Sequence, residues 1–206
     1  MATRITDPYH CTFIHIPKTG GNSITNWMQT NFVNHQVTKR QQHATIDEAK
    51  SYWNIDDLGW KFCVVRNPWD YVVSWYTFKI DVAKVRIEIA NSDPKYKNSR
   101  KEKHNVEIQQ QHIDRLEKLG FDGWLKQTGR SQQIGWAKGC DHIIKLENMK
   151  NGFAEVQKRL NCFEPLGHLN KTRDRKDYKS YYTSQELIDI VAKKYADDIK
   201  EFNYDF

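Results

Sequence analysis

The sequence predicts an α/β fold in which helices flank a central parallel sheet in three layers. Three segments have the β-branched and aromatic content of buried strands: residues 11–16, 62–65 and 142–146. A helical pattern follows each of them. Strands that alternate with helices form parallel sheets covered on both faces, and such sheets bind ligands at the carboxyl ends of their strands.

The composition is that of a folded domain. The chain has 206 residues, of which 38% are hydrophobic and 13% aromatic. This aromatic content argues against disorder, and neither an internal repeat nor a low-complexity linker divides the chain. We therefore expect one domain over residues 1–206. Within it, residues 84–111 are a candidate exposed insertion, and the basic stretch 95–103 reads as an exposed loop.

The net charge and the cysteine content exclude few classes of function by themselves. The 32 Lys and Arg residues outnumber the 26 Asp and Glu residues, giving a net charge of +6 that suits an anionic ligand as well as nucleic acid. No apolar run is long enough to span a bilayer, and residues 1–9 lack the order of a signal peptide. The Cys and His residues show no metal-ligand spacing. We expect a cytoplasmic protein without a metal.

The turn after the first strand has the features of an anion cradle. Residues 17–23 read Pro-Lys-Thr-Gly-Gly-Asn-Ser and join a strand to a helix. Glycines let backbone N–H groups converge on an anion, and the helix N-terminus adds partial positive charge. Lys18 supplies a mobile charge, and Thr19 and Ser23 supply hydroxyls. A Walker loop has its Lys after the glycines, whereas here the Lys precedes them. A Gly-Gly turn alone is equally typical of an ordinary connection.

A second candidate anion site follows the strand at 62–65. Arg66 ends this strand, and a guanidinium can bind phosphate in bidentate fashion. Asn67 is a plausible N-cap of the next helix, whose first position is proline. Ser74 lies on the same helix face as Asn67, so its hydroxyl could join Arg66. Ser74 considered alone is more typical of a helix serine that bonds its own backbone.

These two segments resemble the cofactor-binding motifs of sulfotransferases that use 3′-phosphoadenosine 5′-phosphosulfate (PAPS). Residues 17–23 are similar to the loop that binds the 5′-phosphosulfate, and residues 64–76 to the segment that binds the 3′-phosphate. The similar subgroup contains carbohydrate sulfotransferases, including heparan sulfate 2-O-sulfotransferase. Residues 145–148, 168–171 and 198–206 also resemble this family, so the resemblance covers nearly the whole chain.

The resemblance implies a P-loop-like fold and a metal-free transfer of a sulfuryl group from PAPS to a hydroxyl acceptor. The product would be 3′,5′-phosphoadenosine, and the acceptor a glycan or a small metabolite. Lys18 would stabilise the bridging oxygen as the bond to sulfur breaks. Asn22 stands where the family usually has Thr. The implied cofactor-binding residues are Lys18, Thr19, Gly20, Gly21, Asn22, Ser23, Arg66, Ser74, Lys171 and Thr172.

The candidate general base is His43. Thr45 and Glu48 form a capping-box pattern, which places His43 just ahead of a helix N-terminus. The positive end of a helix disfavours imidazolium, so a neutral imidazole can accept a proton near pH 7. His43 also matches a histidine that the resembling family has between its two phosphate motifs. The alternatives are His15, His112 and Glu147.

Two rival functions stay open from the residues alone. A P-loop kinase of a small molecule should have a Walker lysine and an acidic strand end for magnesium, and the sequence shows neither. A non-catalytic module that binds polyanions should interleave aromatic and basic residues on one face. The aromatic residues here fall mostly at core spacings, as in the single helix that we expect over residues 187–202, so we expect no nucleic-acid partner. The oligomeric state is open.

Overall fold

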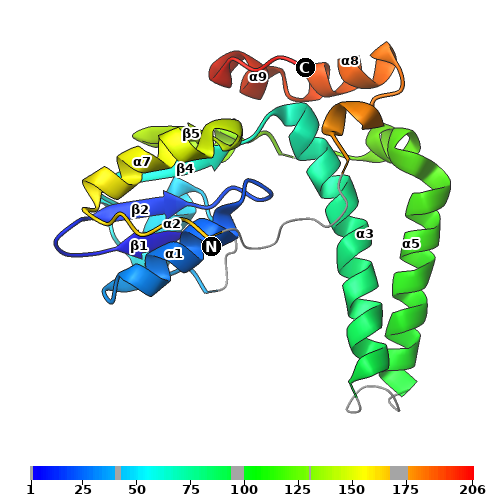
Figure 1. Cartoon of the computed structure of the whole chain (residues 1–206), viewed down its shortest axis with the longest axis horizontal. Helices are drawn as coiled ribbons and strands as arrows, with labels where there is room; N and C mark the ends of the chain where they lie inside the picture. Colours follow the sequence, from blue (N-terminus) through cyan, green and yellow to red (C-terminus); the bar gives the residue numbers. More distant parts are fainter. Residues whose placement is uncertain (1, 40–42, 94–99, 130, 168–175) are drawn as a thin grey trace. The chain divides into compact units, whose positions relative to one another are not determined.

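The computed structural model describes residues 2–39, 43–93, 100–129, 131–167 and 176–206 (Figure 1). The chain divides into two compact units, each built from separate stretches of sequence. The first unit contains Met1–Pro68, Ser131–Lys171 and Tyr195–Asp205, and the second contains Trp69–Arg130, Thr172–Lys194 and Phe206. A single domain over residues 1–206 stays a prediction.

The first unit is built on a five-stranded mixed sheet of order β3-β1-β2-β4-β5. Its strands are β1 (Thr3–Ile5), β2 (Cys11–Ile14), β3 (His35–Val37), β4 (Trp60–Val65) and β5 (His142–Lys145). The three predicted strands are parallel neighbours in the order β2, β4, β5. Strand β1 runs antiparallel to both β2 and β3. The α/β fold is confirmed, although the sheet is mixed rather than wholly parallel.

Helices cover both faces of this sheet. They are α1 (Gly21–Asn31), α2 (Ile46–Trp53), α6 (Ile134–Ala137), α7 (Met149–Arg159) and α9 (Ala196–Phe202). Successive strand residues point to opposite faces. On β4, Phe62 and Val64 therefore join a core cluster with α1 and α7. Cys63 and Val65 join a second cluster with α2, α6 and α9. These two clusters account for the three predicted layers.

The predicted capping box forms at the start of α2. Thr45 N donates to Glu48 Oε2 at 2.8 Å, and Glu48 N donates to Thr45 Oγ1 at 3.3 Å. Each bond satisfies a backbone N–H group that the helix itself leaves without a partner. His43 therefore lies two residues before the N-cap of a fixed helix, as the sequence predicts.

The second unit is helical. Its elements are α3 (Pro68–Ser92), α5 (Arg100–Gln127), η2 (Tyr178–Tyr181) and α8 (Gln185–Lys194). Helix α5 contains a break at Gly120, whose φ is 63°. Tyr76 on α3 packs against Phe121 and Trp124 of α5, with ring centroids 5.5 and 5.4 Å away. The described part of 84–111 continues α3 and begins α5. The loop expected at 95–103 is wrong from Arg100 on, where α5 begins, and residues 94–99 lie outside the described residues. The insertion at 84–111 stays a prediction.

The helix predicted over 187–202 is wrong as a single element. It is divided into α8 and α9 at Tyr195, whose φ and ψ are −120° and 29°. The side chain of Gln132 explains the division. Its Oε1 accepts the backbone N–H groups of Asp197 and Asp198 at 3.0 and 3.2 Å. If α8 continued, these two N–H groups would donate to carbonyl groups of its last turn. Because they donate to Gln132 instead, α8 ends and a new helix, α9, begins.

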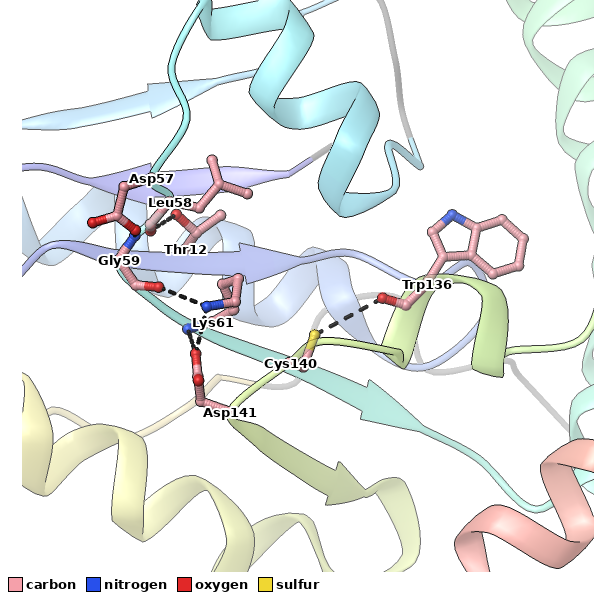
Figure 2. A network of polar contacts seen from close by, with 8 residues as sticks. All are labelled: Thr12, Asp57, Leu58, Gly59, Lys61, Trp136, Cys140 and Asp141. Carbon is pink, nitrogen blue, oxygen red and sulfur yellow. Dashed lines mark hydrogen bonds and ion pairs between the residues drawn. The ribbon is translucent and has the colours of Figure 1, made fainter.

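A polar network fixes the amino ends of the parallel strands (Figure 2). Thr12 Oγ1 in β2 donates to Leu58 O at 2.6 Å. Lys61 in β4 contacts Asp141, just before β5, through its backbone N at 2.7 Å and its Nζ at 2.8 Å. Burial raises the pKa of Asp141, but hydrogen bonds and charge from Lys61 outweigh it and hold the pKa below its usual value. In the same view Cys140 Sγ donates to Trp136 O at 3.8 Å. These contacts are structural.

Candidate functional site

The two predicted anion sites meet at the carboxyl edge of the sheet. Strands β2 and β4 are parallel neighbours, so the loops that follow them leave the sheet at the same edge. Arg66 Nη1 donates to Lys18 O at 3.0 Å, which joins the two loops directly. The loop after β5 is also close, because a Cβ added to Gly20 would lie 3.3 Å from Leu146 Cδ1.

The turn between β2 and α1 favours glycine at two positions for two different reasons, the backbone angle at Gly20 and the lack of space for a Cβ at Gly21. Gly20 has a φ of 78°. A Cβ on Gly21 would lie 2.1 Å from His15 Cδ2, which is closer than any real contact. Lys18 itself has a φ of 64°, in a region that non-glycine residues rarely occupy. Such backbone strain is concentrated at functional sites.

The N-terminus of α1 suits an anion. Gly20 is its N-cap, and among the described residues no side chain caps this end and no acidic residue lies in the first turn. A helix N-terminus carries partial positive charge and presents backbone N–H groups outward. Ser23 N already donates to Gly20 O at 3.1 Å. The N–H groups of Gly21 and Asn22 are therefore the candidate donors of this turn.

The side chains of this turn differ in whether they can donate a hydrogen bond to an anion. Thr19 is fully buried, and its Oγ1 donates its one proton to Ile16 O at 2.9 Å. The expected contact from the Thr19 hydroxyl is thus not available in this geometry, and only its backbone N–H can face an anion. Ser23 is buried in the first turn of α1, whereas the side chain of Asn22 is exposed.

His43 is held as a neutral base by its surroundings. Its Nδ1 lies 3.0 Å from His15 O, and a carbonyl can only accept, so Nδ1 carries the proton and Nε2 keeps its lone pair. Burial lowers the pKa of His43, the bond to His15 opposes this, and the charge of Lys18 lowers the pKa further. Trp136 Nε1 donates to His43 O at 2.7 Å and fixes its backbone.

The three alternative candidates for the general base are either engaged in other contacts or lie elsewhere in the fold. His15 is buried against Gly21, and burial lowers its pKa to about 2, so it stays neutral. Glu147 accepts from Asn67 N with Oε1 at 2.7 Å and from Tyr204 Oη with Oε2 at 3.0 Å. Both carboxylate oxygens of Glu147 are thus engaged in holding backbone and tail. His112 lies on α5 in the second unit.

The described structure does not test the positions of three other predicted residues relative to this edge. Ser74 is buried on α3 in the second unit, so its pairing with Arg66 stays a prediction. Lys171 and Thr172 lie outside the described residues. Within the described ranges, no group of three or more His, Cys, Asp or Glu side chains is placed to hold a metal ion, and no helix is long and apolar enough to cross a membrane.

Sequence reasoning missed Gln133, which contacts the backbone of Arg66. No motif surrounds Gln133. A signal was present in its partner Asp198, a carboxylate within the apolar stripe of the last helical segment. A buried carboxylate needs hydrogen-bond donors, and Asp198 accepts from Gln133 N and Ile134 N at 2.8 Å each.

Comparison with known proteins agrees with this geometry. The sequence profile of the sulfotransferase family matches residues 1–205, nearly the whole chain. No curated protein and no solved structure matches significantly. The α/β fold, with a sheet flanked by helices, is consistent with the P-loop-like fold of that family. The chain therefore belongs to the sulfotransferase family, whose members are enzymes that transfer a sulfuryl group from PAPS.

Proposed function

We propose that this enzyme transfers a sulfuryl group to a hydroxyl of a carbohydrate or small metabolite, with Lys18 and His43 as catalytic residues. The observation that carries the proposal is the bond from Arg66 Nη1 to Lys18 O at 3.0 Å. This bond supports the proposal because Lys18 and Arg66, the two candidate anion-binding residues, lie at one edge of the sheet, and PAPS carries anionic groups at both its 5′ and 3′ positions.

The turn and helix α1 would provide the groups for the sulfuryl end of the donor. Of the loop Gly20–Ser23, the backbone N–H groups of Gly21 and Asn22, at the N-terminus of α1, would hold its oxygens, because Ser23 N already donates to Gly20 O. Lys18 would neutralise the bridging oxygen as charge develops there. Arg66 would bind the 3′-phosphate in bidentate fashion. Ser74, Lys171 and Thr172 are further candidates for this nucleotide.

The reaction needs a proton acceptor as well as charge stabilisation. The acceptor hydroxyl oxygen forms a bond to sulfur, and the bond from sulfur to the 5′-phosphate oxygen breaks. The electron pair of that broken bond leaves with 3′,5′-phosphoadenosine. The acceptor's proton goes to His43 Nε2, which the bond from Nδ1 to His15 O leaves as the basic nitrogen. Positioning for in-line attack supplies most of the catalysis.

The carbohydrate acceptor is the finer part of the proposal. It rests on the resemblance of residues 17–23 and 64–76 to carbohydrate sulfotransferases, including heparan sulfate 2-O-sulfotransferase. A net charge of +6 suits an anionic glycan. Family membership favours this enzyme over a small-molecule kinase or a non-catalytic polyanion-binding module. A cytoplasmic location stays a prediction.

The test combines binding and transfer. Calorimetry should show micromolar binding of 3′,5′-phosphoadenosine that ATP does not reproduce. Enzymatic transfer of labelled sulfate from radiolabelled PAPS should then be observed to one class of acceptor in a panel of glycans and metabolites.

Lys18→Ala should lower kcat by about 100-fold or more, because it removes charge stabilisation of the leaving oxygen. Lys150→Ala removes an exposed lysine of α7 and should leave kcat unchanged. Equal affinity for ATP, or no binding of the bisphosphate, would contradict the proposal.

A further inference from the structure

The backbone of Arg66 is held by the side chain of one residue, Gln133. Arg66 N donates to Gln133 Oε1 at 2.8 Å, and Gln133 Nε2 donates to Arg66 O at 2.8 Å. The β4–β5 register ends one residue earlier, at the pair of Val65 and Lys145. Gln133 therefore satisfies the polar backbone of Arg66 just where the sheet stops doing so.

Gln133 is itself fixed by the carboxylate of Asp198. Gln133 N and Ile134 N donate to the two oxygens of Asp198 at 2.8 Å each, and Gln133 Nε2 lies 3.5 Å from Oδ2. Gln133 and Asp198 are both fully buried. Buried polar groups are tolerated when they are paired, and a satisfied network adopts one arrangement. The path from Asp198 through Gln133 to Arg66 is therefore rigid.

This path fixes the backbone from which the Arg66 side chain starts. Side-chain rotamers depend on the backbone angles of their own residue. The backbone of Arg66 is fixed by Gln133, and its Nη1 reaches Lys18 O at 3.0 Å. We propose that Gln133 is a positioning residue that aims Arg66 at the 3′-phosphate of the sulfuryl donor. This inference rests on the proposed function.

Gln133→Met tests the role, since methionine keeps the length of the side chain but makes neither bond to Arg66. The affinity for 3′,5′-phosphoadenosine should fall roughly tenfold, the effect of weakening one hydrogen bond to a charged group. The KM for PAPS should rise by a similar factor, with a smaller change in kcat, because the 3′-phosphate is remote from the reacting bond.

Gln132→Met is the matched control. Gln132 also joins its segment to the start of α9, through Asp197 and Asp198, but it makes no bond to Arg66. A purely structural role of this junction predicts that both variants weaken binding alike. The positioning role predicts a loss of affinity in Gln133→Met alone, with both variants compared at matched folded fractions by circular dichroism.

A double-mutant cycle separates action through Arg66 from any other effect. In an Arg66→Ala background, Gln133→Met should cause no further loss of affinity, because there is no guanidinium left to aim. An equal loss in both backgrounds would overturn the inference. Gln133→Asn, whose amide is one methylene too short, serves in the same cycle if the methionine variant does not fold. If the natural chain binds no bisphosphate, the proposed function fails; if it binds and Gln133→Met binds as tightly, only this inference fails.

Discussion

The imidazole of His43 is the residue whose protonation should govern the rate. Burial, as the main cause, holds its pKa below the usual value of 6.5. The neutral form therefore persists to lower pH, and kcat/KM should begin to fall at a lower pH than it would with an ordinary histidine. His43→Asn should lose this acid limb and lower kcat by about 100-fold or more. The measurement is a pH–rate profile of both proteins.

The affinity for 3′,5′-phosphoadenosine provides the control for that experiment. Because the proposed role of His43 is to accept a proton and not to hold the nucleotide, His43→Asn should bind the bisphosphate as the natural chain does. A variant with near-normal turnover would exclude His43 as the base. Because both oxygens of Glu147 already accept hydrogen bonds, the search for a base would then pass to other groups.

At single residues the sequence predicted which residues lie at the edge of the sheet better than it predicted their hydrogen-bond partners. Lys18 and Arg66 were identified from their residue type and from their places after strands, and the structure brings them together. The roles of Thr19 and Glu147 depend on partners that no local pattern specifies. The Thr19 hydroxyl donates to Ile16 O, and Glu147 meets the tail residue Tyr204 from 57 positions away. Only the folded chain defines such contacts.

At the scale of the elements, one substitution tests whether the tight packing of the strand–turn–helix unit around Gly21 is needed for stability and for ligand binding. An added methyl group would lie 2.1 Å from the His15 ring, so either the helix start or the ring must move. Gly21→Ala should cost about 1–3 kcal/mol of folding free energy, a typical cost of overpacking. It should also abolish binding of 3′,5′-phosphoadenosine, because the N–H groups of the turn would shift. Denaturant unfolding and calorimetry measure the two effects.

Gly135→Ala is the matched substitution for that test. Gly135 lies in α6, and nothing lies within 4 Å of a Cβ added there. Alanine is a better helix former than glycine, so the stability of the Gly135→Ala variant should be unchanged or slightly higher. If Gly21→Ala kept both its stability and its affinity for the bisphosphate, the close approach of His15 to the turn would not be essential.

Elements with strong local patterns were predictable, and elements defined by distant pairing were not. Strands β2, β4 and β5 carry the β-branched and aromatic content of buried strands. Strands β1 and β3 have only three residues each, with the sequences Thr-Arg-Ile and His-Gln-Val, and pair with each other from 32 residues apart. The division between α8 and α9 depends on Gln132, which lies more than 60 residues earlier. A window of local sequence contains none of this information.

In the sheet-containing unit as a whole, the two ends of the parallel strands have different tasks. The amino ends are joined by the network of Thr12, Lys61 and Asp141 (Figure 2). The carboxyl ends carry the turn after β2 and the Arg66 segment after β4. A substitution at the amino ends should therefore lower stability without changing ligand binding.

Lys61→Met tests this separation, because it removes the ammonium group but keeps the backbone bond from Lys61 N to Asp141. With the Asp141 side chain 44% exposed, the loss of folding free energy should be no more than about 1 kcal/mol. The folded-state pKa of Asp141 lies below its unfolded value of 3.8. The contribution of this pair is thus present above pH 3.8 and is lost as the pH falls through the folded-state pKa. The difference between the two proteins should narrow in acid.

Binding of 3′,5′-phosphoadenosine completes that comparison. A ligand that binds only the folded state adds about 2.7 kcal/mol of stability at 100 times its Kd. This increment depends on the carboxyl ends of the strands, so thermal shifts should give the same increment for Lys61→Met as for the natural chain. Gly21→Ala should show no increment. If Lys61→Met reduced the increment, the amino and carboxyl ends of the sheet would be energetically coupled, and the separation of their tasks would be wrong.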